Sequence, residues 1–339
     1  MPPPEGKKSC KIKVPPDLVV RDVAKLRWGI VATILAPLRN IARFAAYHLD
    51  LGASEINLYL DQPDPQTVEF FAANDAIKIV KCDDLYWQGK REKARRTHQL
   101  RQAFNATRCY NHTKVDWLCH IDVDEFLLTQ APIAQNLAEA PDDVAYMQML
   151  PAELLAQPDP YAGQSHFKLT CAGADQPAEA LTTIYPEFGQ FLNEGFISHT
   201  GGKFFARTGL KDLRVGIHSL RHKGMFVRNG KTFETVYVGH AHAPTWEIFT
   251  SHMNFRMEHG SYRRRKNEAM KLGDIVHLIK QTEGDAGLRR FYDDICFASP
   301  TLLDRLQRHN MLLKARLDLD DKVARWFGEV PHTTPKNRA

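Results

Sequence analysis

The sequence predicts an α/β fold with a doubly wound, mostly parallel sheet, followed by a helical C-terminal segment. Short apolar runs typical of strands alternate with amphipathic helical segments over residues 28–121, and the connections between them are short. The 339 residues are 43% hydrophobic and 25% charged, which is typical of a globular protein with one large domain or two ordinary ones.

The first half of this pattern starts with a strand at residues 28–35, a nearly continuous apolar run of the kind that a parallel strand buried on both faces shows. Pro37 suits the first turn of the helix that follows, and Gly52 stands where that helix should end. Apolar residues alternate over residues 56–60, so we expect a second strand there, ending at Asp61.

The pattern then continues with two helices and two strands. They are a helix starting at Asp64-Pro65, a strand at residues 77–80, a basic helix at residues 90–105 and a strand at residues 115–121. The order β-α-β-α-β-α-β is that of a parallel doubly wound sheet. Farther on, residues 151–200 are rich in Pro, Gly, Gln and Ala and predict long loops, and the chain becomes helical from Thr245.

Three carboxylates, those of Asp122, Asp124 and Glu125, follow the fourth strand. In doubly wound sheets ligands bind beyond the carboxyl ends of the strands, and Asp61 ends the second strand at the same edge. Converging carboxylates suit Mg²⁺ or Mn²⁺ together with phosphate oxygens. The alternative is an acidic turn after a buried strand, and the position at the strand end favours the metal site.

Composition narrows the classes of function. A formal net charge of +5 is compatible with an anionic ligand but does not indicate nucleic acid. The six cysteines lack CxxC spacing, so we expect buried free thiols and no zinc site. The sequence has no apolar run of the about 18 residues that a membrane span needs and no signal-peptide core, which predicts a cytoplasmic protein.

Four segments match a known family in order: Ile30-Val31-Ala32-Thr33 with residues 40–52, residues 59–67, residues 116–126 with Asp122-Val123-Asp124-Glu125-Phe126, and residues 203–218 followed by 240–260. On these segments the chain resembles the family 2-like glycosyltransferases of the GT-A fold, in the branch that carries an acidic-x-acidic-Glu-Phe signature after a Trp-containing strand. The resemblance implies a Rossmann-type GT-A domain over residues 26–260, with a tail at 1–25 and a helical extension at 261–339.

The sequence departs from the family pattern in two places. The family usually has an acidic residue after the Asn of its first helix, whereas Ile41 follows Asn40 here. The family's later histidine is commonly followed by Tyr, whereas this chain has His240-Ala241-His242. The first departure concerns the contact with the nucleoside base, and the second leaves open which histidine does the family's work.

The resemblance implies a metal-dependent glycosyltransferase of the hexosyltransferase type. Such an enzyme moves a sugar from a nucleoside diphosphate sugar, with UDP the expected nucleotide, to a hydroxyl of a carbohydrate or glycolipid acceptor in cell-surface polysaccharide or glycoconjugate synthesis. The cofactor is Mn²⁺ or Mg²⁺, which stabilises the leaving diphosphate. The implied ligands are Asp122, Asp124 and His218, with His240 and His242 as the alternatives to His218.

Further residues are candidates for contact with the donor and the acceptor. Asp61 would bind the nucleoside, and Lys203 and Arg207 could meet phosphate oxygens. Arg96 and Gln99 share a helix face at i and i+3, and we expect both to contact the donor together with Asp122. Glu194 is the candidate catalytic base, and Glu187 lies in the same loop-rich stretch. An enzyme that retains configuration needs no such base, so the stereochemistry stays open.

Two other interpretations compete with this one. A nucleotidyltransferase also uses paired carboxylates and a metal, but it usually has a Gly-rich phosphate loop after its first strand, and residues 35–38 contain no glycine. A non-catalytic binding module could use the basic residues 263–266 to contact acidic partners, membrane lipid or nucleic acid, although such runs are commonly solvated. Peripheral contact with the inner face of a membrane and homo-oligomerisation also stay open.

Overall fold

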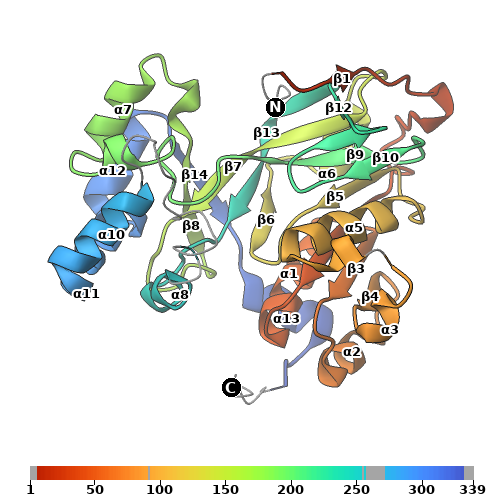
Figure 1. The fold of residues 1–339 in the computed structure, drawn as a ribbon, viewed down its shortest axis with the longest axis horizontal. Helices are drawn as coiled ribbons and strands as arrows, with labels where there is room; N and C mark the ends of the chain where they lie inside the picture. Colours follow the sequence, from red (N-terminus) through yellow and green to blue (C-terminus); the bar gives the residue numbers. More distant parts are fainter. Residues whose placement is uncertain (1–5, 91, 254–255, 257–271, 332–339) are drawn as a thin grey trace. The chain divides into compact units, whose positions relative to one another are not determined.

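The computed structural model describes residues 6–90, 92–253, 256 and 272–331 (Figure 1). The chain folds into two compact units. Unit 1 comprises Met1–Leu150, Gly201–Val238 and Leu319–Ala339, and unit 2 comprises Pro151–Thr200 and Gly239–Asp318. These bounds differ from the predicted segments 1–25, 26–260 and 261–339, because unit 1 takes residues from all three of them.

Unit 1 is built on a sheet whose centre is parallel. Its parallel strands stand in the order β5 (Trp117–His120), β2 (Trp28–Ile34), β3 (Glu55–Leu60) and β4 (Ile77–Lys81). Beyond β5 the sheet continues with β9 (Lys203–Arg207) and the first part of β7 (Tyr146–Leu154), both antiparallel to their neighbours. The predicted α/β class is confirmed, and the sheet is mixed, since β9 runs against the parallel strands and against β7.

Helices connect the parallel strands as the sequence pattern predicts. They are α1 (Leu38–Asp50), α2 (Pro65–Phe71) and α5 (His98–Tyr110). The basic stretch predicted as one helix over residues 90–105 instead holds the short α4 (Glu92–Arg95) and then α5, and α3 (Asp84–Trp87) precedes them. The break falls at Thr97, which is extended and accepts a hydrogen bond from the Leu100 backbone N–H at 3.3 Å, as an N-cap does.

The core of unit 1 forms because strand β2 buries all seven of its residues, so both faces of the sheet must be covered. The last helix, α13 (Leu319–Phe327), packs on α1, and Figure 1 shows the two side by side. Phe327 contacts the rings of Phe70 and Phe71, with centroids 5.6 and 5.2 Å away. This end of the chain, predicted to belong to an extension, is therefore part of the core of unit 1.

The remaining elements of unit 1 are β1 (Ser9–Cys10), η1 (Pro16–Leu18), β6 (Glu125–Leu128), α6 (Ile133–Ala138), β10 (Leu213–Val215), β11 (Leu220–His222), β12 (Met225–Val227) and most of β13 (Gly230–His240). Strand β1 pairs in parallel with β12, so residues 9 and 10, predicted to lie in a tail, take part in a sheet. The N-terminal stretch is also bound by Arg207, whose guanidinium donates to the carbonyl oxygen of Leu18 at 3.0 Å.

Unit 2 combines a small antiparallel sheet with helices. Strand β8 (Gln164–Leu169) pairs with β14 (Leu312–Arg316) and with the end of β7. The helices are α7 (Pro177–Ile184), α8 (Trp246–Ser251), α10 (Leu272–Thr282), α11 (Gly284–Cys296) and α12 (Pro300–Arg308), with η2 (Cys171–Gly173) and η3 (Gly189–Phe191) between β8 and α8. The stretch 151–200, predicted as long loops, therefore contains a strand and a helix. In the described part of the chain, every helix is too short or too polar to cross a membrane.

Candidate functional site

The candidate site lies in unit 1, where strand β5 ends. Asp122 and Asp124 stand in the turn after β5, and Glu125 begins β6, so this acidic motif (Asp122, Asp124 and Glu125) is carried by two short strands. The Glu125 backbone N–H donates to the Asp122 carbonyl oxygen at 3.0 Å, and the Glu125 carboxylate accepts from the Asp122 backbone N–H at 2.8 Å. These two hydrogen bonds fix the turn and fold Glu125 back toward Asp122.

The ammonium of Lys203 contacts the carboxylates of both Asp122 and Glu125. The Lys203 Nζ lies 2.7 Å from Asp122 Oδ2 and 2.9 Å from Glu125 Oε2. The Lys203 side chain is 1% exposed. Burial opposes its positive charge, but the two carboxylates outweigh burial and raise the pKa of Lys203 above its ordinary value. Lys203, predicted to meet phosphate oxygens, is therefore bound in this structure to the acidic motif itself.

Asp122 is also held from the other side. The Gln102 side-chain amide on α5 donates to Asp122 Oδ1, so each carboxylate oxygen of Asp122 has a protein partner. Gln102 was missed in the sequence, although a signal exists. His98, Arg101, Gln102 and Asn105 form a polar stripe along α5 at helical spacing. Arg96 and Gln99, which we expected to contact the donor, are both exposed, and Arg96 lies 3.6 Å from Glu92.

Asp61, predicted to bind the nucleoside, is held by the same polar stripe. Its carboxylate is 4% exposed, lies 2.6 Å from Nη2 of Arg101 and lies 3.4 Å from Nδ1 of His98. Burial would raise the pKa of Asp61, but the hydrogen bonds from His98 and Arg101 outweigh it and lower the pKa below its ordinary value. The ends of β3 and β5 are therefore both tied to α5, one through Asp61 and the other through Asp122.

One buried imidazole beside the acidic motif was also missed. His120 is the last residue of β5, and its Nδ1 lies 3.1 Å from the Gly216 carbonyl oxygen. Its Nε2 is buried and has no hydrogen-bond partner among the described residues. Burial and the charge of Lys203 lower the pKa of His120 to about 4, so the ring is neutral at pH 7. A neutral imidazole nitrogen of this kind can accept a hydrogen bond or bind a metal.

The donor atoms present suit a hard divalent cation. Carboxylate oxygens of the acidic motif and the unpartnered Nε2 of His120 are ligand types that Mg²⁺ and Mn²⁺ accept. Asp124 is half-buried in the turn, and His218 lies after β10 with Nδ1 3.0 Å from the Gly202 carbonyl oxygen. Over the described ranges, no three His, Cys, Asp or Glu side chains are gathered as a ready metal site. The ligand set Asp122, Asp124 and His218 therefore stays a prediction.

Several predicted residues lie in unit 2 and stay predictions. Glu194, the candidate base, has a positive φ of 54°, and its carbonyl oxygen accepts from the Cys171 backbone N–H at 3.0 Å. Glu187 forms an ion pair with Arg290 at 3.1 Å. The rings of His240 and His242, the alternatives to His218, contact each other with centroids 5.0 Å apart. The basic residues 263–266 lie outside the described residues.

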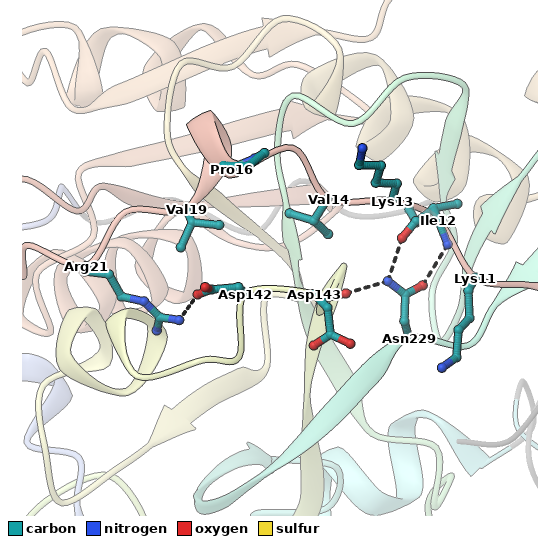
Figure 2. Close-up of a pocket in the computed structure, with 10 residues that line it drawn as sticks. All are labelled: Lys11, Ile12, Lys13, Val14, Pro16, Val19, Arg21, Asp142, Asp143 and Asn229. Atoms are coloured by element: carbon teal, nitrogen blue, oxygen red, sulfur yellow. Dashed lines mark hydrogen bonds and ion pairs between the residues drawn. The ribbon is translucent and has the colours of Figure 1, made fainter.

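A second feature of unit 1 is the pocket drawn in Figure 2, with a volume of about 500 Å³. The N-terminal stretch forms one wall of this pocket. Asn229 holds that wall in place, because its Oδ1 accepts from the Ile12 backbone N–H at 3.1 Å and its Nδ2 donates to the Ile12 carbonyl oxygen at 2.9 Å. Arg21 forms an ion pair with Asp142 at the opposite side of the view. The pocket and the acidic motif share no lining residue, so the pocket is a separate feature.

Comparison with known proteins points to one class of enzyme. The model of glycosyltransferase family 92 matches residues 35–145, which run from the end of β2 past the acidic motif. This match supports a glycosyltransferase. The solved structure titled "Crystal structure of S. aureus TarS 1-349" is 9% identical, covers 88% of this chain and 90% of that chain, and has a TM-score of 0.36. A search of curated proteins gave no match.

Proposed function

We propose that this protein is a metal-dependent glycosyltransferase that uses a nucleoside diphosphate sugar, with UDP as the first nucleotide to test. The observation that carries the proposal is the acidic motif at the carboxyl end of β5, inside the segment that the family model matches. Ligands of doubly wound sheets bind at this edge, and two parallel strand ends present Asp61 and Asp122 there.

The proposed chemistry needs positive charge where the diphosphate leaves. A bound Mn²⁺ or Mg²⁺ supplies that charge, held by Asp124 and by His218 or another imidazole. Asp122 would serve the site from a fixed position, since Gln102 and Lys203 hold both of its carboxylate oxygens. A fixed carboxylate can orient a ribose hydroxyl or a ligand of the cation without losing rotamer freedom on binding.

The rest of the donor would lie along the same sheet edge. Asp61 would accept hydrogen bonds from the nucleoside while Arg101 keeps its carboxylate ionised. If the reaction inverts configuration, Glu194 would remove the proton from the acceptor hydroxyl, which belongs to a carbohydrate or glycolipid.

We further propose a cytoplasmic enzyme that works at the inner face of a membrane. Co-sedimentation with vesicles in the presence of a lipid-linked acceptor would test this location.

Calorimetry tests the proposal directly. We expect Mn²⁺ to bind weakly to the protein alone and much more tightly with UDP, because phosphate oxygens supply the missing ligands. GDP and CDP serve as matched nucleotides that identify the base. Incubation with UDP-sugars should release UDP and depend on Mn²⁺. Release of pyrophosphate from UTP and a sugar 1-phosphate, without release of UDP from UDP-sugars, would indicate a nucleotidyltransferase. Binding without any turnover would indicate a non-catalytic module.

A further inference from the structure

The position of Lys203 affects how tightly a divalent cation can bind at the acidic motif. Strand β9 runs antiparallel to β5, with Cys119 opposite Phe205, so Lys203 on β9 reaches the turn that follows β5. Its ammonium lies within 2.9 Å of two carboxylates and is 1% exposed. Asp122 and Glu125 flank Asp124 in the sequence, so an ammonium bound to both lies close to any divalent cation that the acidic motif would bind.

We infer that Lys203 is the resident counter-cation of the acidic motif and keeps a divalent cation from binding tightly to the protein alone. The inference rests on the proposed function, in which a cation and a diphosphate bind at this motif. Lys203 neutralises one of the two negative charges of Asp122 and Glu125 and repels a second cation at close range. The protein would therefore take up the metal together with the diphosphate, whose own charge outweighs that repulsion.

This role makes Lys203 a positioning residue for the proposed reaction. It holds Asp122 and Glu125 in place while the nucleotide is absent, and two carboxylates this close together repel each other less with an ammonium between them.

The test is Mn²⁺ binding, measured by calorimetry without any nucleotide, to the wild-type protein and to Lys203→Met. Replacement by Met removes the positive charge that lies within 2.9 Å of Asp122 and Glu125, so we expect Lys203→Met to bind Mn²⁺ roughly tenfold or more tightly. Lys203→Arg keeps the charge and should show no gain. The melting temperature of Lys203→Met should rise on addition of Mn²⁺, because the metal replaces the missing ammonium.

Lys168→Met is the matched control. Lys168 is 0% exposed and pairs with one buried carboxylate, that of Glu153, at 3.0 Å. Glu153 also accepts from the backbone N–H groups of Ile197 and Ser198, at 3.4 and 2.8 Å. Loss of Lys168 therefore removes a buried ammonium without exposing a carboxylate pair, and we expect no gain in Mn²⁺ affinity and no thermal rescue by the metal.

Each outcome decides the inference. Equal Mn²⁺ affinity of the wild type and Lys203→Met overturns it, as does an equal gain in Lys168→Met. If Lys203→Met folds poorly, recovery of folded protein on refolding with Mn²⁺ supports the inference, and failure of that rescue overturns it. The proposed function is judged separately by the wild type. A wild type that never binds Mn²⁺ with a nucleotide refutes that function, while a gain in Lys203→Met would still establish the role of Lys203.

Discussion

Arg101 and Asp61, forty residues apart, join the first turn of α5 to the end of strand β3 through an ion pair of 2.6 Å. The Asp61 carboxylate is 4% exposed and the Arg101 side chain is 23% exposed, so the pair lies at the edge of the core and not in free solvent. Asp61 can therefore act in two ways, as a nucleoside ligand or as an anchor that places α5. The two roles predict different results when each partner is removed.

We expect Asp61→Ala to weaken UDP binding by roughly tenfold, the effect of losing one hydrogen bond to a charged group. Arg101→Ala should weaken it less, because the Asp61 carboxylate remains in place. Both variants should lose similar stability, since each breaks the same pair. Calorimetric titration with UDP and Mn²⁺, beside urea unfolding, separates affinity from stability.

Asp64→Ala provides a control for this comparison. The Asp64 side chain caps α2 by accepting from the Thr67 backbone N–H at 3.2 Å, so its loss should cost about 1 kcal/mol of stability without changing UDP affinity. Equal losses of UDP affinity in Asp61→Ala and Arg101→Ala would show that Asp61 serves only as an anchor for α5.

The contact between α13 and α1 predicts a pH dependence of stability. Hydrogen bonds from Arg43 and Arg39 to Asp320 lower the pKa of this carboxyl to about 2. A lowered carboxyl pKa stabilises the fold above the unfolded value near 3.8, and the contribution is lost as the pH falls from about 4 to 2. Because the Asp320 side chain is 53% exposed, we expect Asp320→Asn to cost only about 1 kcal/mol at pH 7.

Urea unfolding at pH 7, pH 4 and pH 2 measures this effect. The difference between the wild type and Asp320→Asn should shrink toward pH 2, where about half of the wild-type carboxyl groups are protonated. Asp321→Asn alters the neighbouring exposed carboxylate and should leave the unfolding free energy nearly unchanged at every pH. A difference that stays constant from pH 7 to pH 2 would refute the ionic origin of the contact.

The buried pair of Glu153 and Lys168 in unit 2 predicts strong non-additivity. Removing one partner by Glu153→Leu leaves the buried ammonium of Lys168 without its carboxylate and should cost about 3–5 kcal/mol of unfolding free energy. The double variant Glu153→Leu with Lys168→Met removes both charges and should be more stable than either single charge-removing variant. Urea unfolding of the four proteins checks this, and additive losses would mean that the pair is not electrostatically coupled.

Local patterns in the sequence located most of unit 1. The burial of β2 on both faces gives a continuous apolar run, and the strand ends at Asp61 and after His120 fall where the pattern predicts them. The same patterns missed the helix break at Thr97, which one side-chain hydrogen bond determines. The basic stretch 90–105 has the composition of one helix, but Thr97 caps a new helix there because its hydroxyl accepts the Leu100 N–H.

The partners of the acidic motif could not be found in the same way. Lys203 lies 81 positions beyond Asp122, and the two meet because β9 runs antiparallel to β5, a long-range pairing that periodicity does not reveal. Gln102 could have been identified from the sequence, because it lies on the same face of α5 as Arg101 and Asn105. A polar stripe on a helix next to a sheet edge is thus a better guide than net basic charge.

Asp124 provides the most direct test of the metal site. Asp124→Asn keeps the size of the side chain and removes one negative charge. If Asp124 binds the cation, the leaving diphosphate loses electrostatic stabilisation, and we expect turnover to fall by about 10²–10³-fold. Stability should stay the same or rise, because the acidic motif then carries fewer like charges. Asp116→Asn is the control. Asp116 directly precedes the first residue of β5, at the opposite end of this strand from Asp124, and the variant should keep normal turnover.

Turnover of a UDP-sugar per folded molecule, measured beside the melting temperature, distinguishes a metal ligand from a structural residue. Asp116 accepts from the Arg27 backbone N–H at 2.7 Å, so its replacement should lower stability by about 1 kcal/mol while sparing the chemistry. The opposite pattern is expected for Asp124→Asn, with unchanged stability and a large loss of Mn²⁺-dependent turnover. A destabilised Asp124→Asn with near-normal turnover per folded molecule would make Asp124 a structural turn residue and would remove the metal site from which the proposed glycosyl transfer is argued.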